Sequence, residues 1–351
     1  MRPGDLPHLL AIARARPAQA GLHVYYGRDR LPARDGLAHG GIVKLQSLSD
    51  AFPNAPRRFN LLYLVSSALP TDAQILVRLA ARRGAAVVLN QNGVAYPGWY
   101  GPGYERVNAP RARILHAADH VVYQSEFCRI SADRFYGARH GPSDVLHNPV
   151  DVRRFTPGSV RRDGLVLLLG GSQYQRYRFD VALETLVRLE ADVRLVVTGE
   201  LSWHADRQQA RREAAEGIEQ LGLGDRVELT GPYAQRDAPD VFRRADVLLH
   251  TKYNDPCPTV VLEAMACGLP IVYSASGGTP ELVGPDAGIG VEAPLDWEQD
   301  HPPAPEALAD GVRRIRERID EYAEAARTRA ETFNVDAWLA RHRALFEQLV
   351  R

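Results

Sequence analysis

Residues 254–270, NDPCPTVVLEAMACGLP, place two carboxylates and a helix start within a short stretch of chain. An apolar block typical of a buried strand, residues 245–250, precedes it, and Gly268 is expected to end the short helix. A strand that leads into a helix presents free backbone N–H groups and the positive end of the helix dipole at one place. Pro258 fits there, because the first turn does not need its missing N–H group. The segment therefore predicts an anion site suited to phosphate.

The two carboxylates, Asp255 and Glu263, are spaced to face the same crevice. Asp255 lies in the expected turn and Glu263 about one turn into the helix, where both suit the paired hydroxyls of a sugar or ribose. Asp255 is equally suited to cap the helix N-terminus. A solvated or capping role for Glu263 fits less well, because a carboxylate inside the apolar run VVLEAMACG needs partners.

The elements that must position these residues alternate along the whole chain. Apolar blocks of strand length are separated by amphipathic stretches of helix length, and runs such as LVLLL and RLVVT are typical of parallel strands covered on both faces. Two such series in succession predict an α/β protein with two Rossmann-like, doubly wound parallel sheets. Strands are expected at residues 22–26, 61–65, 85–89, 120–123, 144–146, 165–169, 193–198, 227–229, 247–250 and 270–273.

The domain division is predicted from a proline-, glycine- and arginine-rich stretch with little periodicity, residues 148–162. We expect a first Rossmann-like domain over residues 1–155 and a second over residues 156–325. Residues 326–351 form an amphipathic helix that has no following strand and is expected to pack back on the first domain.

Composition restricts the class of protein. The chain has 351 residues, of which 45% are hydrophobic and 25% charged, as in ordinary soluble proteins. No apolar run approaches the roughly 18 residues of a membrane span, and the N-terminus has no apolar signal core. Cys128, Cys257 and Cys267 show no CxxC spacing, so neither a disulfide framework nor a zinc site is expected. These features favour a cytoplasmic protein.

The net charge of zero conceals an asymmetry between the two halves. Residues 1–155 contain 20 Lys and Arg against 11 Asp and Glu, a net charge of +9, and the remainder carries −9. The basic half suits an anionic partner and peripheral contact with an anionic membrane surface. Attraction between the two halves alone explains the split equally well.

Several motifs are absent from the sequence. No Asp-x-Asp triplet occurs, which argues against a metal-dependent glycosyltransferase of the single-domain type, and no metal ligands are assigned. No GxxxxGK[ST], GxGxxG or GxSxG motif is present, which disfavours nucleotide kinases, dinucleotide oxidoreductases and hydrolases. No ribbon of interleaved aromatic and basic residues suggests a nucleic-acid partner.

Residues 250–284 resemble the donor-site signature of the family 4 retaining glycosyltransferases, which use nucleotide sugars. That signature is an acidic residue, seven spacers and a glutamate, followed by an Ala-Met-Ala-x-Gly-x-Pro run and a Gly-Gly-x-Pro-Glu turn. Asp255 stands where the family usually has glutamate, and Pro258 where glycine is common. The family's interdomain segment resembles NPVD with RFTP at residues 148–157, and its last helix resembles FNVDAW with HRALFEQL.

The resemblance implies the GT-B fold, in which two Rossmann-like domains face each other across a cleft. It implies an acceptor-binding domain over residues 1–155 and a nucleotide-sugar-binding domain over residues 156–325. Together with the basic first half, it implies an anionic acceptor, such as a lipid-linked sugar at the inner membrane face. It also implies retention of anomeric configuration without metal or cofactor, with the nucleotide sugar as co-substrate. Gly40 and Gly41 resemble the glycine loop after the first strand, where the backbone approaches donor and acceptor.

Two positions depart from the family pattern. The arginine and lysine that usually hold the pyrophosphate are replaced in GGSQYQRYR, residues 170–178, where Arg176 or Arg178 is the nearest cation unless both are solvated. Asn92 stands where many relatives have histidine, and an amide binds a sugar hydroxyl but cannot act as a base.

The predicted site follows from the motif and the resemblance together. Glu263 is assigned to the ribose hydroxyls, Asp255 to the sugar hydroxyls, and Tyr233 to the base. The catalytic candidates are Asp255, Glu263 and Asn92, and the donor-binding candidates are Gly41, Gly171, Arg176, Arg178, Tyr233, Pro258, Thr259, Val260 and Glu263.

The predicted function is transfer of a sugar from a nucleotide sugar to a hydroxyl of a glycan, glycolipid or small molecule, with retention. A non-catalytic nucleotide-sugar-binding protein of the same fold is one alternative. A GT-B epimerase or phosphorylase is another, and the latter would need a pyridoxal-bearing lysine, for which Lys252 is the candidate in the second domain.

Overall fold

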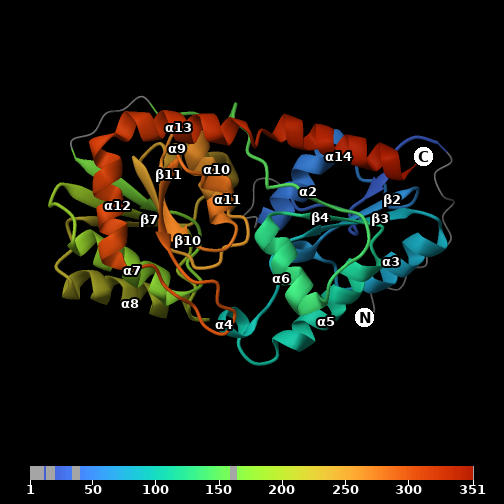
Figure 1. Cartoon of the computed structure of the whole chain (residues 1–351), viewed down its shortest axis with the longest axis horizontal. Helices are drawn as coiled ribbons and strands as arrows, with labels where there is room; N and C mark the ends of the chain where they lie inside the picture. Colours follow the sequence, from blue (N-terminus) through green and yellow to red (C-terminus); the bar gives the residue numbers. More distant parts are fainter. Residues whose placement is uncertain (1–11, 13–19, 34–39, 159–163, 351) are drawn as a thin grey trace. The chain divides into compact units, whose positions relative to one another are not determined.

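The computed structural model describes residues 12, 20–33, 40–158 and 164–350 (Figure 1). The chain forms two compact units: unit 1 comprises Met1–Asn148 and Asp336–Arg351, and unit 2 comprises Pro149–Val335. Residues 149–155, which the predicted division assigns to the first domain, contribute Val150 and Phe155 to the core of unit 2. Within the described residues, no helix is both long and apolar enough to cross a membrane.

Unit 1 contains a parallel sheet with the strand order β1-β2-β3-β4-β5. Its strands are β1 (Val24–Tyr25), β2 (Leu61–Val65), β3 (Ala86–Gln91), β4 (His120–Tyr123) and β5 (Ser143–Val145). Its helices are α2 (Gly40–Ala51), η1 (Ser66–Ala68), α3 (Ala73–Arg82), α4 (Pro97–Tyr100), α5 (Tyr104–Ala117), α6 (Glu126–Tyr136) and α14 (Val335–Leu349).

Helices cover both faces of this sheet (Figure 1). Helices α2 and α14 share one apolar cluster with β2, to which α14 contributes Trp338 and Phe346. His342 of α14 is also buried there, and its Nε2 lies 2.9 Å from the Tyr63 hydroxyl. Helix α3 contacts β2 and β3, α5 contacts β3, and α6 contacts β4, while α5 also contacts both α3 and α6. The C-terminal helix is therefore an integral part of unit 1.

Unit 2 contains a six-stranded parallel sheet with the order β11-β10-β9-β6-β7-β8. Its strands are β6 (Leu165–Leu169), β7 (Val193–Thr198), β8 (Val227–Gly231), β9 (Val247–His250), β10 (Ile271–Ala275) and β11 (Gly288–Glu292). Its helices are α7 (Arg176–Val187), α8 (Arg207–Gln220), η2 (Gln235–Asp237), α9 (Ala238–Phe242), α10 (Thr259–Ala266), α11 (Thr279–Val283), α12 (Pro305–Glu317) and α13 (Ile319–Glu331).

The strand order of unit 2 reverses direction between β6 and β9, which are hydrogen-bonded neighbours. One core cluster joins the sheet to α7, α8 and α12, and another joins it to α9, α10, α11 and α13. Helices thus cover both faces, and the prediction of two Rossmann-like parallel sheets is confirmed. Ligands of such sheets bind at the carboxyl ends of the strands where the order reverses. In unit 2 this place is the carboxyl ends of β6 and β9.

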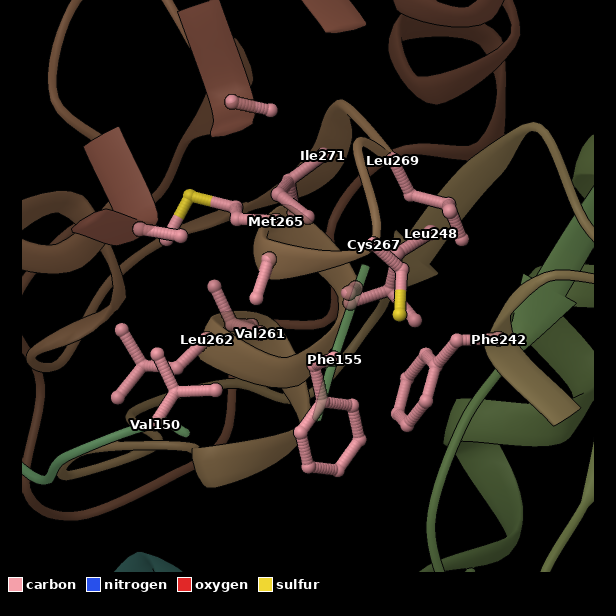
Figure 2. Close-up of a cluster of buried hydrophobic side chains, with 14 of the residues drawn as sticks. Val150, Phe155, Phe242, Leu248, Val261, Leu262, Met265, Cys267, Leu269 and Ile271 are labelled. Carbon is pink, nitrogen blue, oxygen red and sulfur yellow. The ribbon is translucent and has the colours of Figure 1, made fainter. Parts of the chain in front are cut away.

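Helix α10 is anchored by its apolar face (Figure 2). Val261, Leu262 and Met265 lie in the same buried cluster as Phe155 and Phe242. All three cysteines of the chain are buried thiols outside any disulfide, and Cys257 and Cys267 pack in this cluster. The helix ends at Ala266, and Gly268 follows with φ of +79°, the left-handed conformation that favours glycine. Packing thus fixes the direction in which α10 presents its N-terminus.

Strand β11 is the strand of unit 2 that apolar periodicity does not predict. Its sequence, GIGVE, is interrupted by glycine and lacks a continuous apolar run. A Cβ at Gly288 would collide with the Ile271 carbonyl group of β10. The same glycine that conceals the strand in the sequence therefore allows it to pair closely with its neighbour.

Candidate active site

The turn after β6 brings backbone close to the start of α10. A Cβ built on Gly170 would lie 2.7 Å from Cγ2 of Val260, so glycine is needed for this approach. Gly171 has φ of +78°, and no described atom lies within 4 Å of a Cβ built on it. Gly199, after β7, approaches so closely that its Cβ would lie 2.5 Å from the Gly171 carbonyl oxygen. The glycine turn is thus held from one side and open on another.

The N-terminus of α10 supplies backbone donors at the same edge. Pro258 is the residue before the helix, with φ of −70° and ψ of 114°, and Thr259 and Val260 are its first residues. The Val261 N–H donates to the Pro258 carbonyl at 3.2 Å. The amides of Thr259 and Val260 have no acceptor within the helix, as at any helix start. They are free to donate to an anion.

Asp255 lies in the loop before α10 among cationic and polar partners. Its Oδ2 atom is 3.2 Å from Lys252 Nζ and 3.3 Å from His250 Nε2, and its side chain is 13% exposed. Its Oδ1 atom has no hydrogen bond or ion pair within the described part of the chain. Burial opposes ionisation, but Lys252, His250 and Arg178 together hold the pKa of Asp255 well below its usual range. The carboxylate is therefore ionised, with one oxygen left for a ligand.

The Gly-Gly-x-Pro-Glu turn after β10 fixes the backbone of this loop. A Cβ on Gly277, whose φ is +66°, would lie 2.5 Å from the Asp255 carbonyl oxygen. The Gly278 N–H donates to that oxygen at 2.8 Å. Asn254 adopts a left-handed φ of 49°, and its N–H donates to Ser276 Oγ at 2.8 Å. The turn predicted as part of the signature thus sets the position of Asp255.

Glu263 lies within electrostatic range of both Tyr233 and Arg154. Burial raises the pKa of Glu263 to about 7, although the Arg154 charge opposes this. Burial and the Glu263 charge raise the pKa of Tyr233, which follows β8. Arg154 donates to the Gln235 carbonyl and lies 5.3 Å over the Phe155 ring. The side chain of Glu263 has no hydrogen bond within the described residues, which leaves it available to a ligand.

The structure separates the two candidate arginines of α7. Arg178 is 4% exposed, donates through Nη1 to the Ser172 carbonyl at 3.1 Å, and is coupled electrostatically to Asp255. Its Nε atom is buried without a hydrogen-bond partner among the described residues. Arg176 is exposed and pairs with Asp180 and Glu213, each at 3.3 Å. Arg178 is therefore buried within electrostatic range of Asp255, whereas Arg176 is engaged at the surface.

The remaining two predicted residues, Asn92 and Gly41, lie in unit 1. Asn92 follows β3; its Oδ1 accepts from the Gly93 N–H at 2.7 Å and its own N–H donates to Ser66 Oγ at 2.8 Å. Gly40 and Gly41 are the first two residues of helix α2, so the glycine loop expected there is a helix start instead. Gly41 is buried.

Sequence reasoning missed His250, Lys252 and Arg154 as members of the site. The first two flank Thr251 within the signature, but only the loop geometry brings both to Asp255. Arg154 lies in the stretch that resembles an interdomain segment, far along the chain from Glu263. Over the described ranges, no group of three or more His, Cys, Asp and Glu side chains is arranged to hold a metal ion.

Comparison with known proteins gives the family. Residues 158–326 match the family model described as "Glycosyl transferases group 1". A D-inositol 3-phosphate glycosyltransferase of Xylanimonas cellulosilytica is 31% identical over 242 residues, 64% of this chain and 55% of that protein. Another of the same name, from Geodermatophilus obscurus, is 28% identical and covers 68% of this chain and 57% of its own length. The chain spans about half the length of the curated relatives it matches.

Solved structures share the fold. Anabaena HepE in complex with UDP has a TM-score of 0.66 at 18% identity, covering 87% of this chain and 81% of that one. Sucrose-phosphate synthase from Thermosynechococcus elongatus has a TM-score of 0.68 at 20% identity, covering 88% and 77%. The two parallel-sheet units thus define a protein of the GT-B fold. Residues 158–326 of the chain belong to the group 1 glycosyl transferases, which are family 4 glycosyltransferases, and the family resemblance is confirmed.

Proposed function

We propose that the protein is a metal-independent retaining glycosyltransferase that moves a sugar from a nucleotide sugar to an acceptor hydroxyl. The observation that carries the proposal is the placement of Asp255 and Glu263 on either side of the α10 N-terminus. Both carboxylates have oxygens without protein partners, and the helix start lies where the strand order of unit 2 reverses. Such an arrangement matches a ligand with hydroxyls at both ends and phosphate between them.

In this proposal the donor lies along the carboxyl edge of the unit 2 sheet. Glu263 accepts hydrogen bonds from the ribose hydroxyls, and Tyr233 lies against the base. The amides of Thr259 and Val260, with Arg178, bind the diphosphate. Asp255 uses Oδ1 for hydroxyls of the transferred sugar. The relatives' structures with UDP support a nucleotide as ligand of this fold.

The reaction requires positioning more than proton transfer by a side chain. The acceptor hydroxyl attacks the anomeric carbon from the face that the nucleotide leaves, and the bond from that carbon to the phosphate oxygen breaks. The departing phosphate oxygen takes the proton of the hydroxyl. Donors aimed at the diphosphate stabilise the charge that develops there. The side-chain amide of Asn92, whose Oδ1 accepts a hydrogen bond from the Gly93 N–H, fits a mechanism that needs no side-chain base.

For the acceptor we propose a hydroxyl of an anionic molecule held by unit 1. The sequence of residues 1–155 carries a net charge of +9, and the curated relatives are named for a phosphorylated inositol. Unit 1 has a pocket of about 770 Å³ that includes Asp72, Tyr100 and Arg111 in its lining. It begins just after η1, on the carboxyl side of β2.

The test is incubation with UDP-, GDP- and ADP-sugars, with and without inositol phosphates and lipid-linked acceptors, and measurement of released nucleotide. We expect release from one nucleotide sugar, increased by an anionic acceptor, and retained anomeric configuration in the product. Binding of a nucleotide sugar without turnover on any acceptor would favour the non-catalytic alternative. Conversion of the sugar without nucleotide release would favour an epimerase.

A further inference from the structure

Two cations on neighbouring elements share the single carboxylate of Asp255. In the part of the chain that the structure describes, Lys252 Nζ makes one ion pair, with Asp255 at 3.2 Å, and its side chain is 26% exposed. The charge of Arg178 acts on the same carboxylate, and among the described residues its side chain makes one hydrogen bond, to the Ser172 carbonyl. The next carboxylate, Asp300, accepts instead from Gln175 Nε2 at 2.7 Å. Within the described residues, donors of both cations therefore remain unused.

Contacts connect these cations to the start of α10. Gly170 packs against Val260 of α10. Two residues after Gly170, the Ser172 carbonyl accepts a hydrogen bond from Arg178, whose positive charge lowers the pKa of Asp255. Asp255 in turn holds Lys252, whose loop leads into α10. The free amides, the buried guanidinium and the half-buried ammonium thus border the same stretch of the sheet edge. A buried Nε–H without a partner is costly and calls for an acceptor.

We infer that Lys252 is the second cation of a diphosphate subsite, held by Asp255 until a diphosphate arrives. This inference rests on the proposed function, because it names a residue of the same site. Arg178 and the amides of α10 receive one part of the diphosphate, and Lys252 turns from Asp255 to bind another. The move frees Oδ2 of Asp255, so that binding of phosphate prepares the carboxylate for the hydroxyls of the sugar.

The geometry favours Lys252 over the other cations nearby. Arg176, at the same end of α7 as Arg178, is already paired with Asp180 and Glu213. The charge of Arg154 acts on Glu263 and is not among the charges that lower the pKa of Asp255. Lys252 combines a flexible stem, partial exposure and a single partner that itself belongs to the site.

The experiment compares Lys252→Ala, Lys252→Arg and the matched control Arg212→Ala, which removes an exposed charge of α8 paired with Asp206 at 3.7 Å. Isothermal titration calorimetry measures binding of UDP, GDP, ADP, their nucleosides and inorganic pyrophosphate to the full chain. For Lys252→Ala we expect affinity for the bound nucleoside diphosphate and for pyrophosphate to fall roughly 10- to 100-fold. Nucleoside affinity stays within about twofold, Lys252→Arg recovers most of the loss, and the control matches the wild type.

Each outcome has one meaning. Unchanged diphosphate affinity in Lys252→Ala overturns the inference. An equal loss of nucleoside and diphosphate affinity also overturns it, because it shows a general disturbance of the loop. Wild-type binding of pyrophosphate through Lys252 without binding of any nucleotide supports the inference and refutes the proposed function. Nucleotide binding that is as tight in Lys252→Ala as in the wild type overturns the inference and supports the proposed function.

Discussion

Replacement of Glu263 by glutamine should stabilise the free protein while weakening its binding of nucleotide. Burial raises the pKa of this carboxyl from 4.5 to about 7, so the native state holds its proton more tightly than the unfolded state. Stability from this group is therefore present below pH 4.5 and is lost as the pH rises through 7. Each pH unit between the two pKa values is worth about 1.4 kcal/mol.

The magnitude follows from these two pKa values. Relative to wild type, Glu263→Gln should gain about 3 kcal/mol of unfolding free energy at pH 8 and about 1 kcal/mol at pH 5. Both are upper values, because the half-buried side chain keeps some contact with solvent. The difference between the two pH values is the cleaner measurement, since a constant cost of burying the amide cancels. Urea unfolding at pH 5 and pH 8 measures it, with the exposed Glu216→Gln of α8 as control.

Binding should change in the opposite direction. Ribose hydroxyls donate to the ionised carboxylate, so nucleoside affinity of the wild type should rise between pH 6 and pH 8 as Glu263 loses its proton. Loss of a charged acceptor costs about 1.5–3 kcal/mol, or roughly 10- to 100-fold in affinity at pH 8, and the pH dependence should flatten. A variant that binds nucleoside as the wild type does, or that is less stable at pH 8 than at pH 5 relative to wild type, would refute the reasoning.

Four further outcomes are expected. Asp255→Asn should lower kcat/KM for the nucleotide sugar by roughly 10- to 100-fold. Affinity for the nucleoside diphosphate should be kept or raised, because Lys252 and Arg178 lose the carboxylate that holds them. A loss of nucleoside diphosphate affinity equal to the loss of kcat/KM would contradict this. Gly277→Ala should reduce the unfolding free energy by about 1–3 kcal/mol more than Gly222→Ala. Both glycines have a left-handed φ, but only a Cβ on Gly277 would collide with backbone, at 2.5 Å from the Asp255 carbonyl oxygen. Equal losses would show that the loop moves aside to accept the methyl group. Transfer should survive EDTA, and abolition with rescue by Mg²⁺ or Mn²⁺ would show that the diphosphate charge is met by metal. The full chain should co-sediment with anionic and not with neutral vesicles at low salt. Replacement of Arg57 and Arg58, which are exposed before β2, by glutamate should weaken this vesicle binding. Unchanged vesicle binding in that variant would exclude these arginines as the membrane contact.

Much of the fold was predictable because most strands are apolar on both faces. β2 and β4 have the predicted bounds, because both are fully buried and each contains one continuous apolar run. β11 was not predictable from periodicity, because its glycines serve backbone packing that only the partner strand reveals. Gly40 and Gly41 show the converse case: a local pair typical of a loop is helical here.

The site was predictable as a motif but not as a set of contacts. Asp255, Glu263 and the α10 start lie within one continuous stretch, so their spacing alone indicates shared chemistry. Arg176 and Arg178 are two residues apart, and only the packing of α7 decides which one is buried. The pairing of Lys252 with Asp255 depends on the left-handed backbone at Asn254 and the glycine turn beneath it.

The interrupted chain of unit 1 has a consequence for the order of folding during synthesis. Unit 2 is one continuous segment, Pro149–Val335, whose two ends are joined by hydrogen bonds between Val150 and residues 333 and 335. Unit 1 needs Trp338 and Phe346 to complete its core, and the ribosome adds both after all of unit 2. Domains usually finish folding in the order in which they emerge. Here the unit that begins the chain is the last to close, and its exposed apolar face must stay soluble while the second unit is made.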